Sequence, residues 1–413
     1  MLDTRAPMFL TCAQGVEAQL AAECGALLAP GTQGQAIEQS RGGVRVSAGP
    51  LEAMRLNLHS RLAQRVLWPL RGGRYRDEHD LYAFAREVDW PHWITPQQTL
   101  RVDTSAWRSP LKSLNFATLR VKDAVCDVMR ETTGERPNVD TQRPHLALML
   151  YLGPEEFMLY ADLSGEALFK RGWRDARGGR VDVKGEAPLK ETLAAAMLAA
   201  AGWQGREEDG ALLDPCCGAG TIAIEAAQIA CGMAPGLQRA FAFEKLAPFR
   251  PHLADWQGMK AQARAAVHPP RVAVHAGDVS FRMTDFAQRN AERAGVAHAI
   301  AFKTADALQR PAPAERGVIV MNPPYGERLE AKGAARSAAS PRQGFEEGNA
   351  LLFYEGLAAQ WKRAYPGWTA WVLTPEMKLP GLMRLKESRR VPMFNGAIEC
   401  RLFRFDMVVG AMV

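Results

Sequence analysis

The chain has 413 residues, of which 47% are hydrophobic and 23% are charged. This composition is typical of a globular protein with two to four domains. The net charge of +6 permits an acidic partner such as nucleic acid without demanding one. No apolar run approaches the roughly 18 to 20 residues of a membrane span, and the first residues lack a secretion signal. We therefore expect a cytoplasmic protein with no membrane partner; the composition indicates no particular oligomeric state.

The seven cysteines are an odd number and include no Cys-x-x-Cys pair. Both features argue against a disulfide framework and against a structural zinc site. We expect reduced cysteines in the core and no metal ion.

The first half of the chain is predicted to be α/β. Apolar runs favour strands at 8–11, 43–47, 65–70, 99–104, 146–152 and 157–162. Helices are expected at 16–24, where Gly25 would end the helix, from 51 onward, at 80–88 and at 117–132. These elements suggest two modules, at 1–60 and 61–165. A connector at 166–186 follows, in which basic residues alternate with glycines.

The second half, from 187 to 413, alternates helices with strands, which is typical of a mostly parallel sheet covered on both faces. A helix is expected at 189–201, a strand, glycine loop and helix at 211–230, and further strands at 271–275, 301–304 and 318–321. The insertion at 232–270 should form its own surface helices. Residues 331–344, rich in Ala, Ser and Gly, are predicted to form a mobile loop beside the site.

The glycine loop from Asp214 to Thr221 places two glycines where a strand turns into a helix. Without Cβ atoms, Gly218 and Gly220 let a ligand lie against the backbone. A dinucleotide enzyme prefers a third glycine to seat a pyrophosphate, and Ala223 occupies that place. The loop therefore favours a cofactor other than a nicotinamide dinucleotide.

An adenosine ligand needs a carboxylate that accepts hydrogen bonds from both ribose hydroxyls. Asp278 is one candidate, because it follows the strand expected at 271–275. Glu244 lies nearer the usual spacing of about 20 residues but is not clearly at a strand end. Further along, Asp306 follows the strand at 301–304 and could bind an adenine amino group.

The tetrapeptide Asn322-Pro323-Pro324-Tyr325 ends the strand at 318–321, where open α/β sheets bind ligands. Proline fixes the backbone, so that the Asn322 amide oxygen and the Pro323 carbonyl can accept both hydrogens of a planar amine. This would favour a pyramidal nitrogen and aim its lone pair at a sulfonium methyl group, by orientation and fixed dipoles. Tyr325 offers a face on which a base can stack.

At this point the sequence resembles the THUMP-domain class I RNA guanine-N2 methyltransferases, and among them the bacterial enzymes of large-subunit ribosomal RNA. Besides the glycine loop and the segment Asn322 to Arg328, short matches spread over nearly the whole chain carry the resemblance. They are Phe9–Cys12, Gly15–Glu17, Arg120–Ala124, Glu131–Pro137, Lys170–Arg174, Ala187–Glu191 and Phe394–Arg401.

The resemblance implies a ferredoxin-like lead-in at 1–60, a THUMP RNA-binding domain at 61–165, a basic linker at 166–186 and a Rossmann-like methyltransferase domain at 187–413. Some relatives carry a second methyltransferase domain, whereas this sequence is expected to be the form with one. The implied cofactor is S-adenosylmethionine, and the implied partner is RNA, with 23S ribosomal RNA the leading substrate.

The resemblance also implies site residues. It selects Asp278 over Glu244 as the ribose acid, although Val279-Ser280 follows here where the family often has Ile-Asp. The implied catalytic residues are Asn322, Pro323, Pro324 and Tyr325. The implied cofactor contacts are Asp214, Pro215, Cys216, Gly218, Gly220, Thr221, Asp278, Val279, Asp306, Ala307 and Asn322. From their charge, we expect phosphate contacts at Lys170, Arg171, Arg174, Arg389 and Arg390.

Other functions fit parts of this pattern. Transfer RNA guanine-N2 methylation would use the same site, and N6-adenine methylation of nucleic acid or glutamine methylation of a protein would use the same tetrapeptide. A module that grips RNA argues against a protein substrate. An RNA-binding assembly factor without turnover is a further alternative, which the intact acceptors at Asn322 and Pro323 disfavour.

Overall fold

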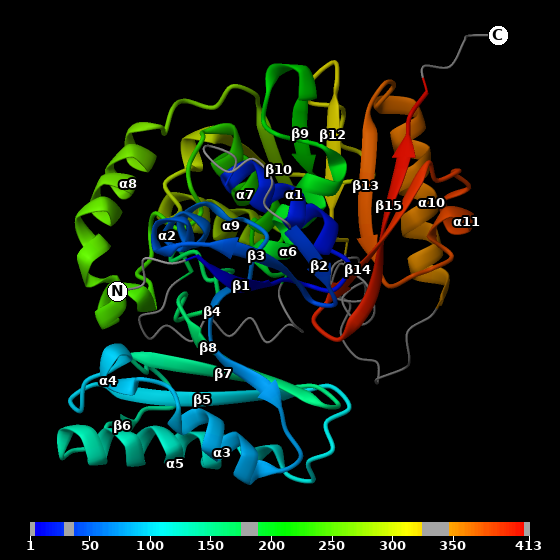
Figure 1. Ribbon diagram of the computed structural model, residues 1–413. Helices are drawn as coiled ribbons and strands as arrows, with labels where there is room; N and C mark the ends of the chain where they lie inside the picture. Colours follow the sequence, from blue (N-terminus) through cyan, green and yellow to red (C-terminus); the bar gives the residue numbers. More distant parts are fainter. Residues whose placement is uncertain (1–4, 29–36, 175–188, 324–346, 409–413) are drawn as a thin grey trace, which may run out of the picture. The chain divides into compact units, whose positions relative to one another are not determined.

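The computed structural model describes residues 5–28, 37–174, 189–323 and 347–408. The chain divides into two compact units (Figure 1). Unit 1 comprises residues 1–12, 20–168 and 239–262, and unit 2 comprises residues 13–19, 169–238 and 263–413. Within the described ranges, each helix is too short or too polar to cross a membrane.

Unit 1 is built on a mixed sheet of eight strands within the described residues, in the order β2-β3-β1-β4-β8-β7-β5-β6. The pairs of β5 with β6 and with β7 are parallel, and the other neighbours are antiparallel. The strands are β1 Ala6–Thr11, β2 Ile37–Ser40, β3 Gly43–Ala48, β4 Arg65–Arg74, β5 Thr99–Ala106, β6 Asn138–Val139, β7 Leu146–Leu152 and β8 Glu156–Asp162.

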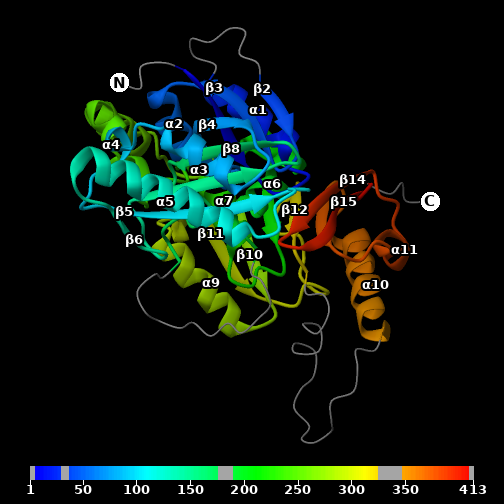
Figure 2. The same ribbon diagram turned by 60° about the horizontal axis from the view of Figure 1, so that its bottom comes forward.

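Two of the helices in the first 168 residues pack together. In both views α3 and α5 lie side by side (Figure 1 and Figure 2), and α5 packs on β5. Ser113 caps α5 by accepting from the Phe116 N–H, and Gly134 ends it in the left-handed conformation. The helices are α1 Glu17–Leu28, α2 Pro50–His59, α3 Glu78–Arg86, α4 Trp90–Trp93 and α5 Leu114–Thr133.

The insertion after the glycine-loop helix forms one mostly exposed helix, as expected, and two short 3-10 helices that also bury large rings. Its elements are η2 Ala242–Lys245, η3 Ala247–His252 and α8 Leu253–Ala265. Phe243, Phe249 and Trp256 are fully buried, and the Phe249 ring meets Trp68 edge-on at 6.0 Å between centroids. Apolar burial of this size stabilises by about 1.5–3 kcal/mol per side chain. The insertion is therefore part of the core of unit 1.

Unit 2 contains a sheet of seven strands within the described residues, in the order β11-β10-β9-β12-β13-β15-β14. The first five of these are parallel, as expected for a Rossmann-like domain, and β15 and β14 complete the sheet in antiparallel fashion. The strands are β9 Ala211–Asp214, β10 Val274–Asp278, β11 Ile300–Thr304, β12 Gly317–Met321, β13 Thr369–Thr374, β14 Arg389–Asn395 and β15 Ile398–Asp406.

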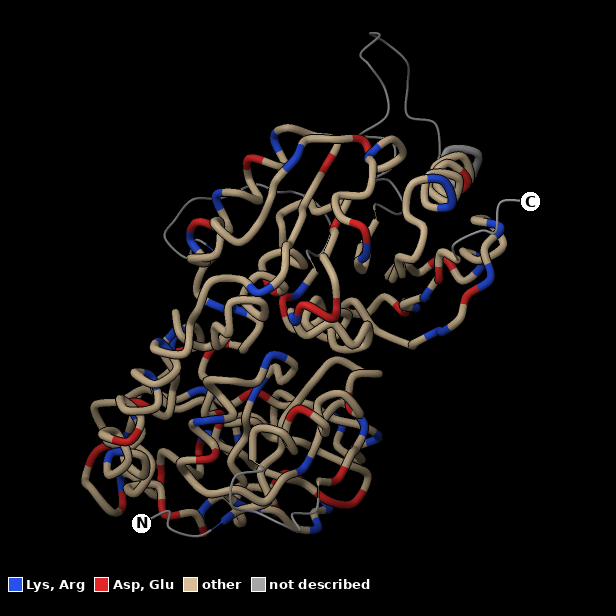
Figure 3. The backbone as a smooth tube through the Cα atoms, turned by 90° about the horizontal axis from the view of Figure 1, so that it is seen from above, with Lys and Arg blue, Asp and Glu red and all other residues tan. Residues whose placement is uncertain are grey.

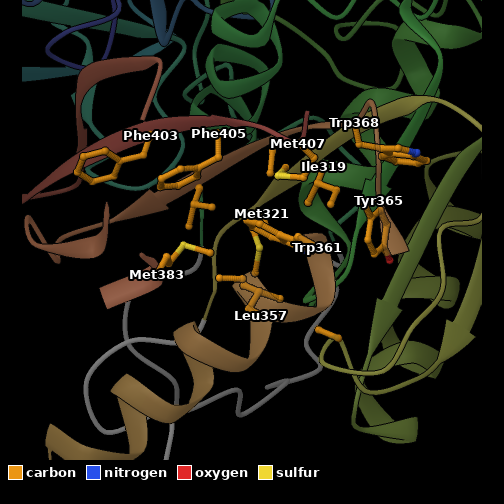
Figure 4. Packing of buried hydrophobic residues seen from close by; sticks show 14 of the residues in the cluster. Ile319, Met321, Leu357, Trp361, Tyr365, Trp368, Met383, Phe403, Phe405 and Met407 are labelled. Carbon is orange, nitrogen blue, oxygen red and sulfur yellow. The ribbon is translucent and has the colours of Figure 1, made fainter. Parts of the chain in front are cut away.

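The helices and 3-10 turns of unit 2 connect these strands. They are α6 Glu191–Ala201, η1 Glu207–Asp209, α7 Thr221–Ala230, α9 Phe281–Arg293, η4 Ala297–Ala299, α10 Glu347–Ala364 and α11 Leu379–Met383. On one side of the sheet, α10 covers β12 and β15, and a cluster that includes Trp361, Tyr365, Trp368, Phe403 and Phe405 fills the space between them (Figure 4). This core fixes the end of β12 that precedes Asn322.

Charged residues of both signs and the seven cysteines are spread over the fold. Basic and acidic residues are interspersed along the backbone of the described residues (Figure 3). All seven cysteines are described and none is in a disulfide; Cys216 is partly exposed and the other six are buried. Burial of six of the seven agrees with the expectation of core cysteines.

Candidate active site

Acidic and amide side chains meet at one edge of the sheet of unit 2. Because β9, β10, β11 and β12 are parallel, their carboxyl ends share this edge. Asp214 ends β9, Asp278 ends β10, Asp306 follows β11 and Asn322 follows β12. The chain runs outward from β9 to β11 and returns to β12 on the other side of β9, and ligands bind at such a reversal of strand order.

The glycine loop turns sharply between β9 and α7. Gly218 and Gly220 have φ angles of +52° and +84°, which favour glycine because other residues are strained there. A Cβ atom at Gly218 would have no other atom within 4 Å, whereas one at Gly220 would lie 3.0 Å from the Cβ of Ala287. Gly220 is therefore needed for packing, and Gly218 leaves open space in which a ligand can approach the backbone.

Asp278 connects β10 to the glycine loop. Its carboxylate is buried and accepts the Gly218 N–H on Oδ2 at 3.1 Å and the Ser280 N–H on Oδ1 at 3.0 Å. An ionised carboxylate is an acceptor-only group with about four lone-pair sites. The next residue, Val279, is 47% exposed although apolar. Asp278 thus holds the loop and offers acceptors beside it. The alternative acid, Glu244, lies in unit 1, where its Oε2 atom is 3.5 Å from the Nζ atom of Lys260.

Asp306 begins the turn after β11. Its carboxylate accepts the Leu308 N–H at 2.9 Å and the Gln309 side-chain amide at 3.2 Å. Ala307 is buried in the core cluster. Asp306 is partly exposed, so the turn presents its acid at the same edge as Asp278.

Asn322 carries the unsatisfied acceptor of the site. Its side-chain oxygen Oδ1 is buried and has no hydrogen-bond partner within the described part of the chain. A buried acceptor without a donor costs about 1–3 kcal/mol, so such groups call for a functional explanation. Pro323 is buried beside it, and Pro324 and Tyr325 lie outside the described residues.

Arg310 is a residue of this edge that the sequence did not single out. Its guanidinium is buried, and the Nη1 atom has no partner among the described residues. Burial lowers its pKa, and Tyr365, Cys217 and Asp214 oppose that shift. A Cβ atom at Gly277 would lie 2.3 Å from Nη1. No motif in the sequence marks this cation, because only folding brings it against Gly277.

A family model for the RMKL-like methyltransferase domain matches residues 177–404, more than half of the chain. The chain belongs to the RMKL-like methyltransferase family. Models for the THUMP domain and for the RlmL ferredoxin-like domain match residues 75–162 and 7–67. The expected family and the expected fold class are therefore confirmed.

Relatives of this methyltransferase family cover the chain broadly. A protein of Shewanella pealeana named ribosomal RNA large subunit methyltransferase K/L is 36% identical over 370 residues, which is 88% of this chain and 48% of the relative. One of Saccharophagus degradans with the same name is 35% identical and matches 98% of this chain and 51% of its own. The chain spans about half the length of these curated relatives.

Solved structures of similar fold include a possible methylase from Clostridium difficile, which is 25% identical with a TM-score of 0.80 and covers 99% of this chain and 100% of its own. A protein from Listeria monocytogenes described as a predicted N6-adenine-specific DNA methylase is 26% identical with a TM-score of 0.80. That match covers 97% of this chain and 96% of its own.

Two arginines of the expected basic linker, Arg171 and Arg174, form ion pairs with side chains of unit 2. Arg171 is 2% exposed and its guanidinium pairs with the buried Glu225 of α7 at 2.9 Å. Its assignment as an RNA contact is therefore wrong, because burial leaves no face for a phosphate. The Arg174 Nη2 atom donates to the Thr221 hydroxyl at 2.8 Å, and its Nε atom donates to Glu191.

Arg174 therefore positions the first residue of α7, which the sequence associated with the cofactor. Burial raises the pKa of Glu191, and Arg174 opposes that shift. The linker arginines stabilise the helix after the glycine loop, while Lys170, Arg389 and Arg390 are exposed.

Proposed function

We propose that the chain transfers a methyl group from S-adenosylmethionine to the exocyclic N2 of a guanine in 23S ribosomal RNA. Membership of the RMKL-like methyltransferase family supports methyl transfer. The THUMP match and the names of the curated relatives support ribosomal RNA as the substrate. The observation that carries the proposal is the buried Oδ1 of Asn322, which has no hydrogen-bond partner among the residues that the structure describes.

Asn322 fits the chemistry of an aromatic amine. The guanine amino group donates two hydrogens, and its lone pair is delocalised into the ring, so it is a poor nucleophile. An amide oxygen fixed at the end of β12 would accept one of those hydrogens and orient the lone pair. The donor missing from the structure would thus be supplied by the base itself, flipped out of its stack into the site.

The residues around the glycine loop fit S-adenosylmethionine. When bound, this cofactor supplies an electrophilic methyl group on a positively charged sulfur. The open space at Gly218 would let its amino acid part approach the backbone. The Asp278 carboxylate would accept from the ribose hydroxyls, Val279 and Ala307 would border the adenine, and Asp306 would accept from the adenine amino group. The other proposed contacts are Asp214, Pro215, Cys216, Gly220 and Thr221.

RNA contacts are proposed at exposed cations of the methyltransferase unit. Arg389 and Arg390 lie on β14, and Lys170 precedes the buried Arg171. Each phosphate that they contact would add salt dependence to RNA affinity. Arg174 is a weaker candidate for an RNA contact, because its guanidinium already binds Glu191 and Thr221. A ribosomal RNA substrate would place the enzyme in the cytoplasm.

Transfer RNA guanine-N2 methylation is the second candidate, since the same acceptor would serve it. Nucleotide-resolution mapping of modified guanines in a strain that lacks the protein separates the two. Loss of one N2-methyl mark in 23S RNA supports the proposal, and loss of a mark in transfer RNA alone supports the alternative.

Incubation with methyl-labelled cofactor and ribosomal RNA tests the mechanism. Asn322→Ala should lower methyl incorporation on the order of 10²–10³-fold, the size of losing one fixed dipole at a reacting group. Asn138→Ala, in the exposed strand β6, is the matched control. Cofactor affinity by calorimetry should fall much less than methyl incorporation, although Asn322 is also an expected cofactor contact. Undiminished incorporation by Asn322→Ala would refute the mechanism, and no incorporation by the wild-type chain on any RNA would support the non-catalytic assembly factor.

A further inference from the structure

Unit 1 exposes an unusual group of large apolar side chains along one rim. Trp107, Phe116 and Leu119 are 44%, 46% and 43% exposed. We call these three residues, with Arg108 and Lys112, the Trp107 surface. Single exposed apolar residues need no explanation, but a concentration of them marks an interaction site.

Contacts between β5 and α5 bring these residues to the same rim. The Thr104 and Thr118 hydroxyls lie 2.6 Å apart and join the end of β5 to the first turns of α5. Trp107 lies three residues beyond Thr104, about 10 Å along an extended chain. Phe116 lies two residues before Thr118, about 3 Å along the helix axis.

The loop that carries Trp107 is held in place. The Trp107 N–H donates to the Leu152 carbonyl at 2.9 Å, and the Ser109 hydroxyl lies 2.7 Å from the Tyr75 hydroxyl. Between them, Arg108 has φ of +53°, a conformation that non-glycine residues adopt only where the surroundings enforce it. The aromatic ring is thus presented on an ordered loop, which lowers the entropy cost of binding.

The charge of this segment is one-sided. From Ser105 to Lys122 there are four basic residues and no acidic residue. The acids that flank the segment, Asp103 and Asp123, each pair with a basic neighbour, Arg101 and Lys122. The Arg108 guanidinium lies 4.9 Å from the centre of the Trp107 ring. Arg108 and Lys112 are exposed, so the surface combines aromatic faces with positive charge.

We infer that the Trp107 surface binds an unpaired segment of RNA, with bases stacked on Trp107 and Phe116 and phosphates at Arg108 and Lys112. Aromatic faces read bases that are not stacked in a helix, which favours a single strand over a duplex. The positive charge complements an RNA backbone and not an apolar protein groove. This inference rests on the proposed RNA substrate and adds which part of unit 1 holds it and in what form.

Fluorescence anisotropy of the full chain tests this, with a labelled 12-nucleotide single strand and the blunt duplex of the same sequence as probes. Trp107→Ala and Phe116→Ala should each weaken single-strand binding about 5- to 150-fold. Trp107→Phe should restore most of it. Lys112→Ala should reduce the slope of log affinity against log salt by about 0.7, whereas Trp107→Ala should leave the slope unchanged.

Val139→Ala is the matched control, because Val139 is 51% exposed and pairs with Leu100 at the other end of β5. If the wild-type chain bound the single strand, and Trp107→Ala and Phe116→Ala bound it with the same affinity, the assignment of RNA binding to the Trp107 surface would be wrong. The proposed RNA substrate would stand. A wild-type chain that binds neither probe would overturn the proposed RNA substrate as well. If Trp107→Ala converted a dimer to a monomer at unchanged RNA affinity, the surface would be a protein interface and the inference would be wrong.

Discussion

The Asp278 carboxylate accepts a hydrogen bond from the Gly218 N–H at 3.1 Å. The acid of β10 therefore supports the glycine loop even before any ligand binds. A change at Asp278 should act on the loop and on a bound ribose together.

Asp278→Asn should raise the Kd for S-adenosylmethionine roughly 10- to 150-fold, because hydrogen bonds to a charged acceptor contribute about 1.5–3 kcal/mol. Isothermal titration calorimetry of the full chain measures this. Asp285→Asn, in an exposed pair with Arg289, should leave the Kd unchanged. An unaltered Kd in Asp278→Asn would exclude Asp278 from the cofactor site.

Gly277→Ala should displace Arg310, since the new Cβ would lie 2.3 Å from Nη1 and 3.0 Å from the Lys303 carbonyl. Overpacking of this kind costs about 1–3 kcal/mol, so we expect a lower Tm and weaker cofactor binding. Gly258→Ala in α8, where a Cβ meets no atom within 4 Å, should instead stabilise by about 0.5–1 kcal/mol. Equal melting temperatures for the two variants would contradict the packing described.

Arg171→Met should destabilise the protein by about 3–5 kcal/mol, because it leaves the buried Glu225 carboxylate without its guanidinium. Arg171→Met combined with Glu225→Met should recover part of this loss, since both charges are then removed. Urea denaturation followed by tryptophan fluorescence compares the variants, with the exposed Arg289→Met as control. If Arg171→Met had normal stability but reduced RNA affinity, Arg171 would be an RNA contact after all.

Tyr365 should make unit 2 sensitive to alkali. Burial raises the pKa of its hydroxyl to about 12, and the hydroxyl donates to the Arg310 carbonyl at 3.1 Å. The unfolded chain loses this proton near pH 10 and the folded chain near pH 12, so between them unfolding releases it. Its stabilisation is full below pH 10 and is lost as pH rises to 12, by up to about 1.4 kcal/mol per pH unit.

Urea denaturation across this pH range measures the free energy of unfolding. The loss due to Tyr365 should be present in the wild type and in Tyr151→Phe, which changes an exposed tyrosine, and absent from Tyr365→Phe. The same pH dependence in Tyr365→Phe would assign the titration to another group.

The motifs predicted the parallel part of unit 2 because each lies at a strand end. The boundaries were less accurate: β10 runs to Asp278 rather than ending at His275. Helix α1 continues through Gly25 to Leu28, since burial of Leu20, Cys24 and Leu28 on one stripe outweighs the roughly 1 kcal/mol that a helical glycine costs. Strands β13, β14 and β15 were not anticipated, because no ligand motif marks them.

Site residues whose role depends on distant partners could not be read from the sequence. Arg171 and Arg174 have the composition of a solvated linker, and only folding brings Glu225 and Glu191 to them. Arg310 stands alone in a stretch of prolines and alanines. The acceptor at Asn322 was predicted from its motif. The structure was needed to show that this oxygen is buried and has no donor within the described ranges.

The insertion at 239–262 makes the two units inseparable by a single cut. The chain passes between them five times, and Phe243, Phe249 and Trp256 complete the core of unit 1 although they follow the glycine loop. A fragment starting at residue 187 would carry these rings with no partner core, and a fragment ending at 165 would lack them. Either half should therefore aggregate when expressed alone and regain solubility when the two are produced together.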